Sequence, residues 1–336
     1  MHTVTFVYDN GTENNTIEVE EGKYLAKPTD PSKTGYTFGG WFIDDFKWGF
    51  EYVAVMKDTT LTAKWTIVEY EISYVLNGGE NSELNPATYT VEDSITLADP
   101  TRTGYNFTRW SEGSSIAEGS AGNKTFTAIW EPIHYKINYV LNGGENSELN
   151  PDTYTIEDSI AIDNPTKRGY YFLGWEEGTY MIEVGSMGEK TFTAKWMIHD
   201  YFIQYILHGG TENYKNPSRY TINDSITFED SYRYGYIFEG WFDYHDKTKR
   251  VTSIEKGSVG DLDLEAKWKA IDYDIHYELN GGTNNELNPA TYTVEDTITL
   301  ADPTRDKYIF TGWKEGGTIT RGSTGEKTFT ATWQII

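Results

Sequence analysis

The six histidines are the side chains best suited to metal binding or acid–base catalysis, and their spacing favours neither role. No pair has the H-x-x-x-H spacing that would put two metal ligands on one helix face. The chain has no cysteine, which excludes a thiolate metal site, a disulfide framework and a cysteine nucleophile. The histidines are His2, His134, His199, His208, His245 and His276. We therefore expect neither a metal nor a cofactor.

Acidic residues are abundant, and those that recur have a structural explanation. Four aspartates each precede Ser-Ile or Thr-Ile, where a carboxylate can accept the backbone N–H groups of a turn. The segment Asp261–Glu265 alternates acids with Leu262 and Leu264, which predicts a strand and not a calcium loop. The four aspartates are Asp93, Asp158, Asp224 and Asp296.

Motifs for phosphate binding and for serine catalysis are missing. The glycine pairs, such as Gly209-Gly210, precede predicted strands and lack the G-x-G-x-x-G and G-x-x-x-x-G-K patterns. No G-x-S-x-G elbow occurs either. The sequence thus contains no constellation that predicts an enzyme.

Composition narrows the class of protein further. The chain has 336 residues and a formal net charge of −24, which argues against nucleic acid and against an anionic membrane surface as partners. No stretch approaches the ~20 apolar residues of a membrane span. The start, Met1–Val4, has no basic region followed by an apolar core, so no signal peptide is expected in this chain.

The tryptophans reveal an internal repeat, because ten of the eleven fall into two regularly spaced sets. The first set is Trp41, Trp110, Trp175, Trp241 and Trp313, and the second is Trp65, Trp130, Trp196, Trp268 and Trp333. Turn signals such as Asn77-Gly78-Gly79 recur with the same period. This pattern predicts five tandem repeats of about 65–72 residues. Their predicted boundaries are 1–66, 67–131, 132–197, 198–268 and 269–336.

The hydrophobic period within each repeat is that of β-strands. Tyr70, Ile72, Tyr74 and Leu76 alternate with mostly polar neighbours, and no window shows a sustained helical period. Each repeat is predicted to contain four or five strands and at most one helical turn. The expected fold class is therefore mainly β, with a small α+β domain as the alternative.

Both sets of tryptophans are predicted to be core residues. A repeat this small has neither a disulfide nor a metal, so it needs a dense core, and each aromatic side chain buries ~150–250 Å². The alternative is a row of exposed platforms for sugar rings. The alternation of Phe126, Ala128 and Trp130 favours the core.

The linkers between repeats are short and constant in length. Four residues separate the last tryptophan of one repeat from the first tyrosine of the next, as in Thr66–Glu69, and none of these linkers is a Gly/Ser tether. Such linkers predict a restricted angle between neighbours. The five repeats are thus expected to form an elongated rod, roughly 150–200 Å long at ~30–40 Å per small domain.

These motifs resemble the Listeria–Bacteroides repeat family, which includes the B-repeat of internalin B. The likeness rests on Gly35-Tyr36-Thr37-Phe38-Gly39-Gly40-Trp41 followed by Leu61-Thr62-Ala63-Lys64-Trp65, and it extends over all five repeats. Arg109 and Lys307 replace glycines of the hallmark, so those two turns are not expected to need a positive φ. The resemblance implies a β-grasp-like domain found in tandem on bacterial surface proteins, outside the catalytic or recognition head. It also implies an extracellular location on the bacterial cell surface, with the signal and the anchor expected outside this segment.

One loop departs from the repeat pattern. The fourth repeat has an insertion at 243–250, the densest basic cluster of an acidic chain. One hypothesis is a longer solvated loop, and the other is a contact point for an anionic glycan or an acidic protein patch. The loop could also pair with the chain's own acidic surface. The candidate contact residues are Tyr244, His245, Lys247, Lys249 and Arg250.

Two functions remain in competition. The first is a non-catalytic, monomeric stalk on a bacterial cell surface that projects a head domain of an adhesin. The second is an adhesive module in which the repeats bind a host-surface protein or glycan, with avidity from copy number. The second predicts that exposed residues recur as faithfully as core residues. Glu83-Leu84-Asn85 recurs in three repeats, but Tyr214-Lys215-Asn216 replaces it in the fourth.

Overall fold

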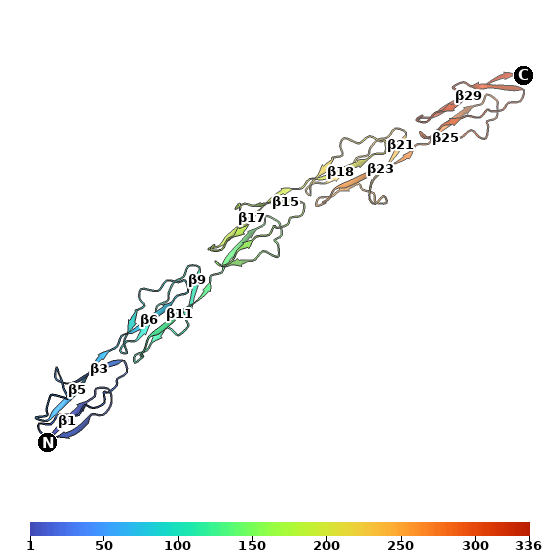
Figure 1. Cartoon of the computed structure of the whole chain (residues 1–336). Helices are drawn as coiled ribbons and strands as arrows, with labels where there is room; N and C mark the ends of the chain where they lie inside the picture. The colour runs from blue at the N-terminus through green and yellow to red at the C-terminus, as the bar shows by residue number, and fades with distance from the viewer. The chain divides into compact units, whose positions relative to one another are not determined.

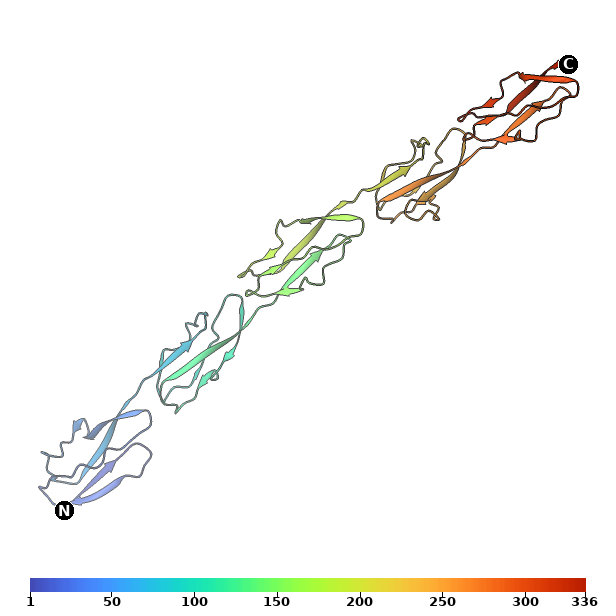
Figure 2. The same ribbon diagram turned by 45° about the vertical axis from the view of Figure 1, so that its right-hand side comes forward.

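The computed structural model describes residues 1–336 and contains strands, turns and loops but no helix. In Figures 1 and 2 each repeat is a local group of strands drawn in one part of the colour range, so its strands come from one continuous stretch of sequence. The chain divides into two compact units, one of residues 1–138, 151–162 and 180–191 and one of residues 139–150, 163–179 and 192–336. The boundary passes through the third repeat, and every contact described below joins residues of one unit.

The strand bounds of the first two repeats show how one repeat is built. The first repeat has β1 (His2–Val7), β2 (Asn15–Val19), β3 (Tyr36–Ile43), β4 (Phe46–Lys47) and β5 (Thr59–Ile67). The second has β6 (Tyr70–Val75), β7 (Thr88–Tyr89), β8 (Ile95–Thr96), β9 (Tyr105–Trp110), β10 (Ser115–Ile116) and β11 (Lys124–Pro132).

The last three repeats have the same six elements as the second. The third has β12 (Tyr135–Val140), β13 (Thr153–Tyr154), β14 (Ile160–Ala161), β15 (Tyr170–Trp175), β16 (Met181–Ile182) and β17 (Lys190–Ile198). The fourth has β18 (Tyr201–Ile206), β19 (Arg219–Tyr220), β20 (Ile226–Thr227), β21 (Tyr236–Asp243), β22 (Ser253–Ile254) and β23 (Leu262–Ala270). The fifth has β24 (Tyr273–Glu278), β25 (Thr291–Tyr292), β26 (Ile298–Thr299), β27 (Tyr308–Trp313), β28 (Thr318–Ile319) and β29 (Lys327–Ile335).

The main sheet of each repeat is mixed. In the second repeat the order is β7-β6-β11-β9, with β6 parallel to β11 and β9 antiparallel to it. The fourth and fifth repeats have the same order, and the first adds β4 at its edge. Two parallel central strands flanked by antiparallel ones form a β-grasp-like sheet, so the mainly β prediction is confirmed. The sequence allowed at most one helical turn in the middle of the repeat, and the structure has none there: a two-stranded sheet, β8 with β10 in the second repeat, occupies that place.

The core of each repeat lies on one face of the main sheet. In the second repeat Ile72, Phe126 and Ala128 are buried together with Trp110 and Leu97, and Trp130 packs partly buried against them. Their alternation along the strands follows from the two-residue side-chain period of a strand, which sends every second residue to the same face.

The Asn-Gly-Gly turns require left-handed backbone at their first two positions. Asn77 has a φ of 50° and Gly78 a φ of 86°, the geometry of a tight turn with two residues at positive φ. The expectation for Lys307 is wrong, since this residue adopts a φ of 66° although it has a Cβ. The backbone is fixed there by the hydrogen bonds from Tyr308 N to Arg305 O and from Ile336 N to Lys307 O. Arg109 has no positive φ, in line with its prediction.

The recurring aspartates close a turn between the two sheets. In the second repeat Asp93 Oδ2 accepts a hydrogen bond from Thr90 N at 2.6 Å and from Thr90 Oγ1 at 2.8 Å. The backbone bond, with help from the hydroxyl, lowers the pKa of Asp93. The same turn occurs at Thr155–Asp158, Thr221–Asp224 and Thr293–Asp296.

We expect these four turns to make the protein sensitive to acid. A carboxyl with a lowered folded pKa stabilises the fold above its unfolded pKa of 3.8, and that contribution is lost as the pH falls through the folded pKa. Substituting Asn at all four aspartates should therefore reduce stability at pH 7 and flatten its decline below pH ~4. Urea unfolding across this range measures both effects. An unchanged pH profile in the fourfold variant would contradict the assignment.

Candidate functional site

The junctions between repeats are the most regularly built feature outside the cores. Each contains a Gly-Tyr pair at the start of the strand that pairs antiparallel with the closing strand, and the linker to the next repeat runs beside it. Gly35, Gly104, Gly169 and Gly235 all have a φ of 77–79°. Their carbonyl oxygens accept hydrogen bonds of 2.9–3.0 Å from the linker residues Val68, Ile133, His199 and Ile271. The linker is thereby fixed to the repeat that it leaves.

The closing strand of each repeat also continues into the linker. Strand β5 ends at Ile67 and β11 at Pro132, each beyond the last tryptophan of its repeat. The four-residue linkers therefore consist of strand followed by hydrogen-bonded backbone. They contain no free tether.

An apolar side chain of the following repeat lies against each junction glycine. A Cβ added to Gly35 would lie 2.0 Å from Val91 Cγ1, and one added to Gly169 would lie 2.8 Å from Ile222 Cβ. Ile156 and Val294 occupy the equivalent positions at Gly104 and Gly235. Glycine is required here both for the positive φ and for the close approach of the next repeat.

A tyrosine hydroxyl then reaches across the junction. Tyr105 Oη donates to Glu157 Oε1 at 2.6 Å, and Tyr236 Oη donates to Glu295 Oε1 at 2.7 Å. Tyr36 donates to Glu92 in the same way. The hydrogen bond to the carboxylate raises the pKa of each of these tyrosines. At the remaining junction Asn223 replaces the acid, and its Nδ2 lies 3.5 Å from Tyr170 Oη.

A cation lies over the ring of the same tyrosine in all five repeats, a contact that the sequence analysis missed. The distances from the charged group to the ring centroid are 3.6–4.5 Å. The pairs are Lys33–Tyr36, Arg102–Tyr105, Lys167–Tyr170, Arg233–Tyr236 and Arg305–Tyr308. The signal was available, because Lys or Arg recurs three residues before this tyrosine in an acidic chain. Each contact stabilises its tyrosine by about 0.5–1 kcal/mol.

The two sets of tryptophans occupy different environments. Members of the first set are buried, with 1–8% of their surface exposed. Members of the second set are partly buried, and each donates its indole N–H to a backbone carbonyl, as Trp130 does to Leu76 O at 2.8 Å. Neither set forms a row of fully exposed platforms.

The basic cluster of the enlarged loop is paired with acids of its own repeat. Lys249 lies 3.5 Å from Asp243, Lys247 lies 3.5 Å from Glu265, and His245 lies 3.0 Å from Asp263. Arg250 packs against Gly240, and Tyr244 is 41% exposed. The loop therefore pairs with acidic residues of its own chain, which was one of the alternatives predicted from the sequence. Binding of a partner at the loop stays a prediction.

No group of three or more His, Asp or Glu side chains in residues 1–336 could hold a metal ion. The structure also has no helix that is long and apolar enough to cross a membrane.

Comparison with known proteins identifies relatives of this chain. The model of the Listeria-Bacteroides repeat domain matches residues 2–64, 70–128, 135–195, 201–267 and 273–333. A protein named "Putative membrane protein" from Evansella cellulosilytica is 28% identical over 80% of this chain and 44% of its own length. Another from the same organism, named "Putative Gly-rich membrane protein", is 29% identical over 63% of this chain and 26% of its own length. Internalin H of Listeria monocytogenes is 29% identical over 45% of this chain and 27% of its own length. The chain thus spans less than half of each of these relatives.

Proposed function

This chain belongs to the Listeria-Bacteroides repeat domain family, and from that premise we propose that it is a non-catalytic spacer of a bacterial surface protein. In this role the five repeats hold another part of the protein, such as the head of an adhesin, away from the cell. Relatives of which the aligned part of this chain covers less than half, two of them named membrane proteins and one an internalin, support this proposal.

The main support for the proposal is that the same kind of junction occurs four times, once between each pair of neighbouring repeats. A spacer must resist bending at each link, and each link here combines a hydrogen-bonded linker with an apolar contact on a glycine. Three of the four add a hydrogen bond from tyrosine to a carboxylate. A flexible tether would need none of these contacts.

The adhesive alternative has one observation in its favour. Leu84, Leu149 and Leu287 recur at the tip of the same loop and are 80–84% exposed. Lys215 occupies that position in the fourth repeat, so the exposed surface does not recur as faithfully as the core. The spacer is therefore the better supported general function.

Small-angle scattering of the monomeric chain in dilute buffer tests the spacer. We expect a maximum dimension of roughly 150–200 Å, from ~30–40 Å per repeat, and a rod-like cross-section. Light scattering on the same sample should give the mass of one chain. A compact particle of roughly 70–90 Å would contradict the proposal, because the repeats would then fold back on one another.

A further inference from the structure

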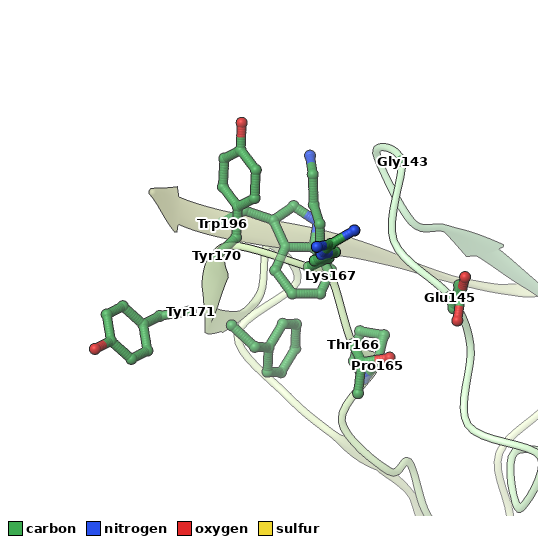
Figure 3. A pocket seen from close by; sticks show the side chains of 10 residues that line it. Gly143, Glu145, Pro165, Thr166, Lys167, Tyr170, Tyr171 and Trp196 are labelled. Atoms are coloured by element: carbon green, nitrogen blue, oxygen red, sulfur yellow. The ribbon is translucent and has the colours of Figure 1, made fainter. Parts of the chain in front are cut away.

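The third repeat contains a pocket whose polar groups are unlike those of its sister repeats. The pocket has a volume of about 620 Å³ and is open to solvent, within the range of small-ligand sites. Its walls come from the turn after β12, the segment before β15, β15 itself and Trp196 on β17. Figure 3 shows Lys167 beside the Trp196 ring, with Glu145 on a separate loop.

Two neighbouring cations line this pocket. Lys167 Nζ lies 4.3 Å from the Tyr170 ring centroid and 5.8 Å from that of Trp196, and it donates to Asn142 O at 2.7 Å. Arg168 is exposed and adjoins it in the lining. None of the ion pairs in the structure, defined by an N–O distance of at most 4.0 Å, includes Lys167 or Arg168. Their positive charge is therefore available to a ligand, in contrast to the paired cations of the enlarged loop.

The sister repeats show which of these features belong to the common fold. The position of Arg168 is Thr34, Thr103, Tyr234 and Asp306 in the other repeats, so only the third has two adjacent cations there. Tyr171 likewise corresponds to Thr37, Asn106, Ile237 and Ile309. Since four repeats fold without Arg168 and Tyr171, the fold does not require them.

Tyr171 also lines the pocket, and two exposed apolar residues lie near it, one on β15 and one paired with it on β17. Tyr171 is 46% exposed, and its ring lies 4.2 Å from that of His199, to which its hydroxyl is hydrogen-bonded. Leu173 and Met197 are 57% and 50% exposed. In Figure 3 the Tyr171 ring lies to one side of the group formed by Lys167 and Trp196. A ligand in the pocket would thus meet cations at one end and an aromatic face beside them.

We propose that this pocket binds an oligosaccharide containing a carboxylated sugar, such as a uronic acid. Arg168 would pair with the carboxylate in a bidentate manner, and Lys167 would add a second charge-assisted hydrogen bond. The Tyr171 ring would pack on the apolar face of the sugar. Glu145, which also lines the pocket, would accept hydrogen bonds from sugar hydroxyls. The site would make one repeat of the spacer a ligand-binding module.

Titration calorimetry of the full chain with tetragalacturonate tests this inference. We expect one site per chain and no binding of the fully methyl-esterified tetramer, which has the same rings without the charge. Arg168→Thr places the residue of the second repeat in the third, and it should weaken binding at least about tenfold, equivalent to about 1.4 kcal/mol. Tyr171→Asn should also weaken it.

Matched controls keep the result interpretable. Lys247→Thr removes a positive charge that is already paired with Glu265 and should leave the affinity unchanged. The double variant Thr103→Arg, Asn106→Tyr builds the pair into the second repeat and should add a second site. The inference is overturned by five equal sites, by equal binding of the methyl ester or of tetraglutamate, or by an unchanged affinity in Arg168→Thr. Absence of heat up to about 10 mM ligand, beyond the millimolar Kd range, also overturns it.

Discussion

Replacing Trp110 with alanine is expected to unfold the second repeat while the other repeats stay folded. Trp110 is 2% exposed, and its ring packs against Phe107 at 5.4 Å, Tyr74 at 5.7 Å and Phe126 at 6.3 Å. Removing such a side chain costs about 3–5 kcal/mol. A repeat of this size has a total stability of about 3–10 kcal/mol, so the loss is of the same order as the whole.

Calorimetry together with hydrogen exchange would resolve this prediction. The second repeat should lose protection, and a separate transition should appear at lower temperature, because each tandem repeat has its own core. Trp110→Phe is the matched control. The indole N–H of Trp110 has no protein acceptor, so phenylalanine keeps an aromatic ring in the core and breaks no hydrogen bond to the protein. A single transition shared by all five repeats of the alanine variant would show instead that the junctions couple the cores.

Much of the fold follows from sequence because the signals are local and repeated five times. A two-residue period, Asn-Gly turns and regularly spaced tryptophans each depend on neighbouring residues, so they are readable without knowledge of long-range pairing. The small second sheet was harder to predict. Its strands, such as Ile95–Thr96 and Ser115–Ile116, are two residues long and pair across about twenty residues. Such segments are too short to show a period.

The error at Lys307 has a different cause. The replacement of glycine predicts a turn without a positive φ, but the backbone hydrogen bonds of the turn fix the conformation. A residue other than glycine then carries the strain, about 1–3 kcal/mol. The residue type at one position is therefore weaker evidence for the backbone conformation there than the hydrogen-bond pattern that all the repeats share.

The sequence predicts how many charged side chains the protein has, but not which of them form ion pairs with one another. The basic loop at 243–250 was visible in the sequence, whereas its partners Asp263 and Glu265 lie on β23, about fifteen residues or more from the cations they meet. Lys167 and Arg168 looked like any other pair of surface charges. Only the structure shows that they line a pocket with Trp196 and that neither is in an ion pair.

The junction gives the second large prediction, that Gly35→Ala separates the first repeat from the second. The added Cβ would lie 2.0 Å from Val91 Cγ1, 2.5 Å from Cγ2 and 2.8 Å from Cβ. A rotation of the valine side chain cannot relieve the last of these contacts, because the Cβ moves only with the backbone. Burial of a valine contributes about 1.5–3 kcal/mol. If the docked arrangement of the two repeats outnumbers the undocked one by about ten to one, losing this contact would make the undocked arrangement the more populated one.

Because the chain has no cysteine, spin labels can be placed at two chosen sites and the distance between them measured. Glu51 in the first repeat and Ser114 in the second are exposed, so the substitutions Glu51→Cys and Ser114→Cys provide the two labelling sites. The distance distribution should be narrow in the parent chain and at least about twofold broader in Gly35→Ala, since the undocked repeats would sample many orientations.

Gly22→Ala separates the effect of backbone strain from that of the collision. Gly22 has the same φ of 79° as Gly35 and lies in the same repeat, but a Cβ there would have no neighbour within 4 Å. Both variants carry an alanine at positive φ, and only Gly35→Ala collides with the next repeat. If the two distributions match, the glycine–valine contact does not set the angle between repeats. In that case the remaining contacts must do so: the hydrogen-bonded linker at Val68 and the hydrogen bond from Tyr36 to Glu92.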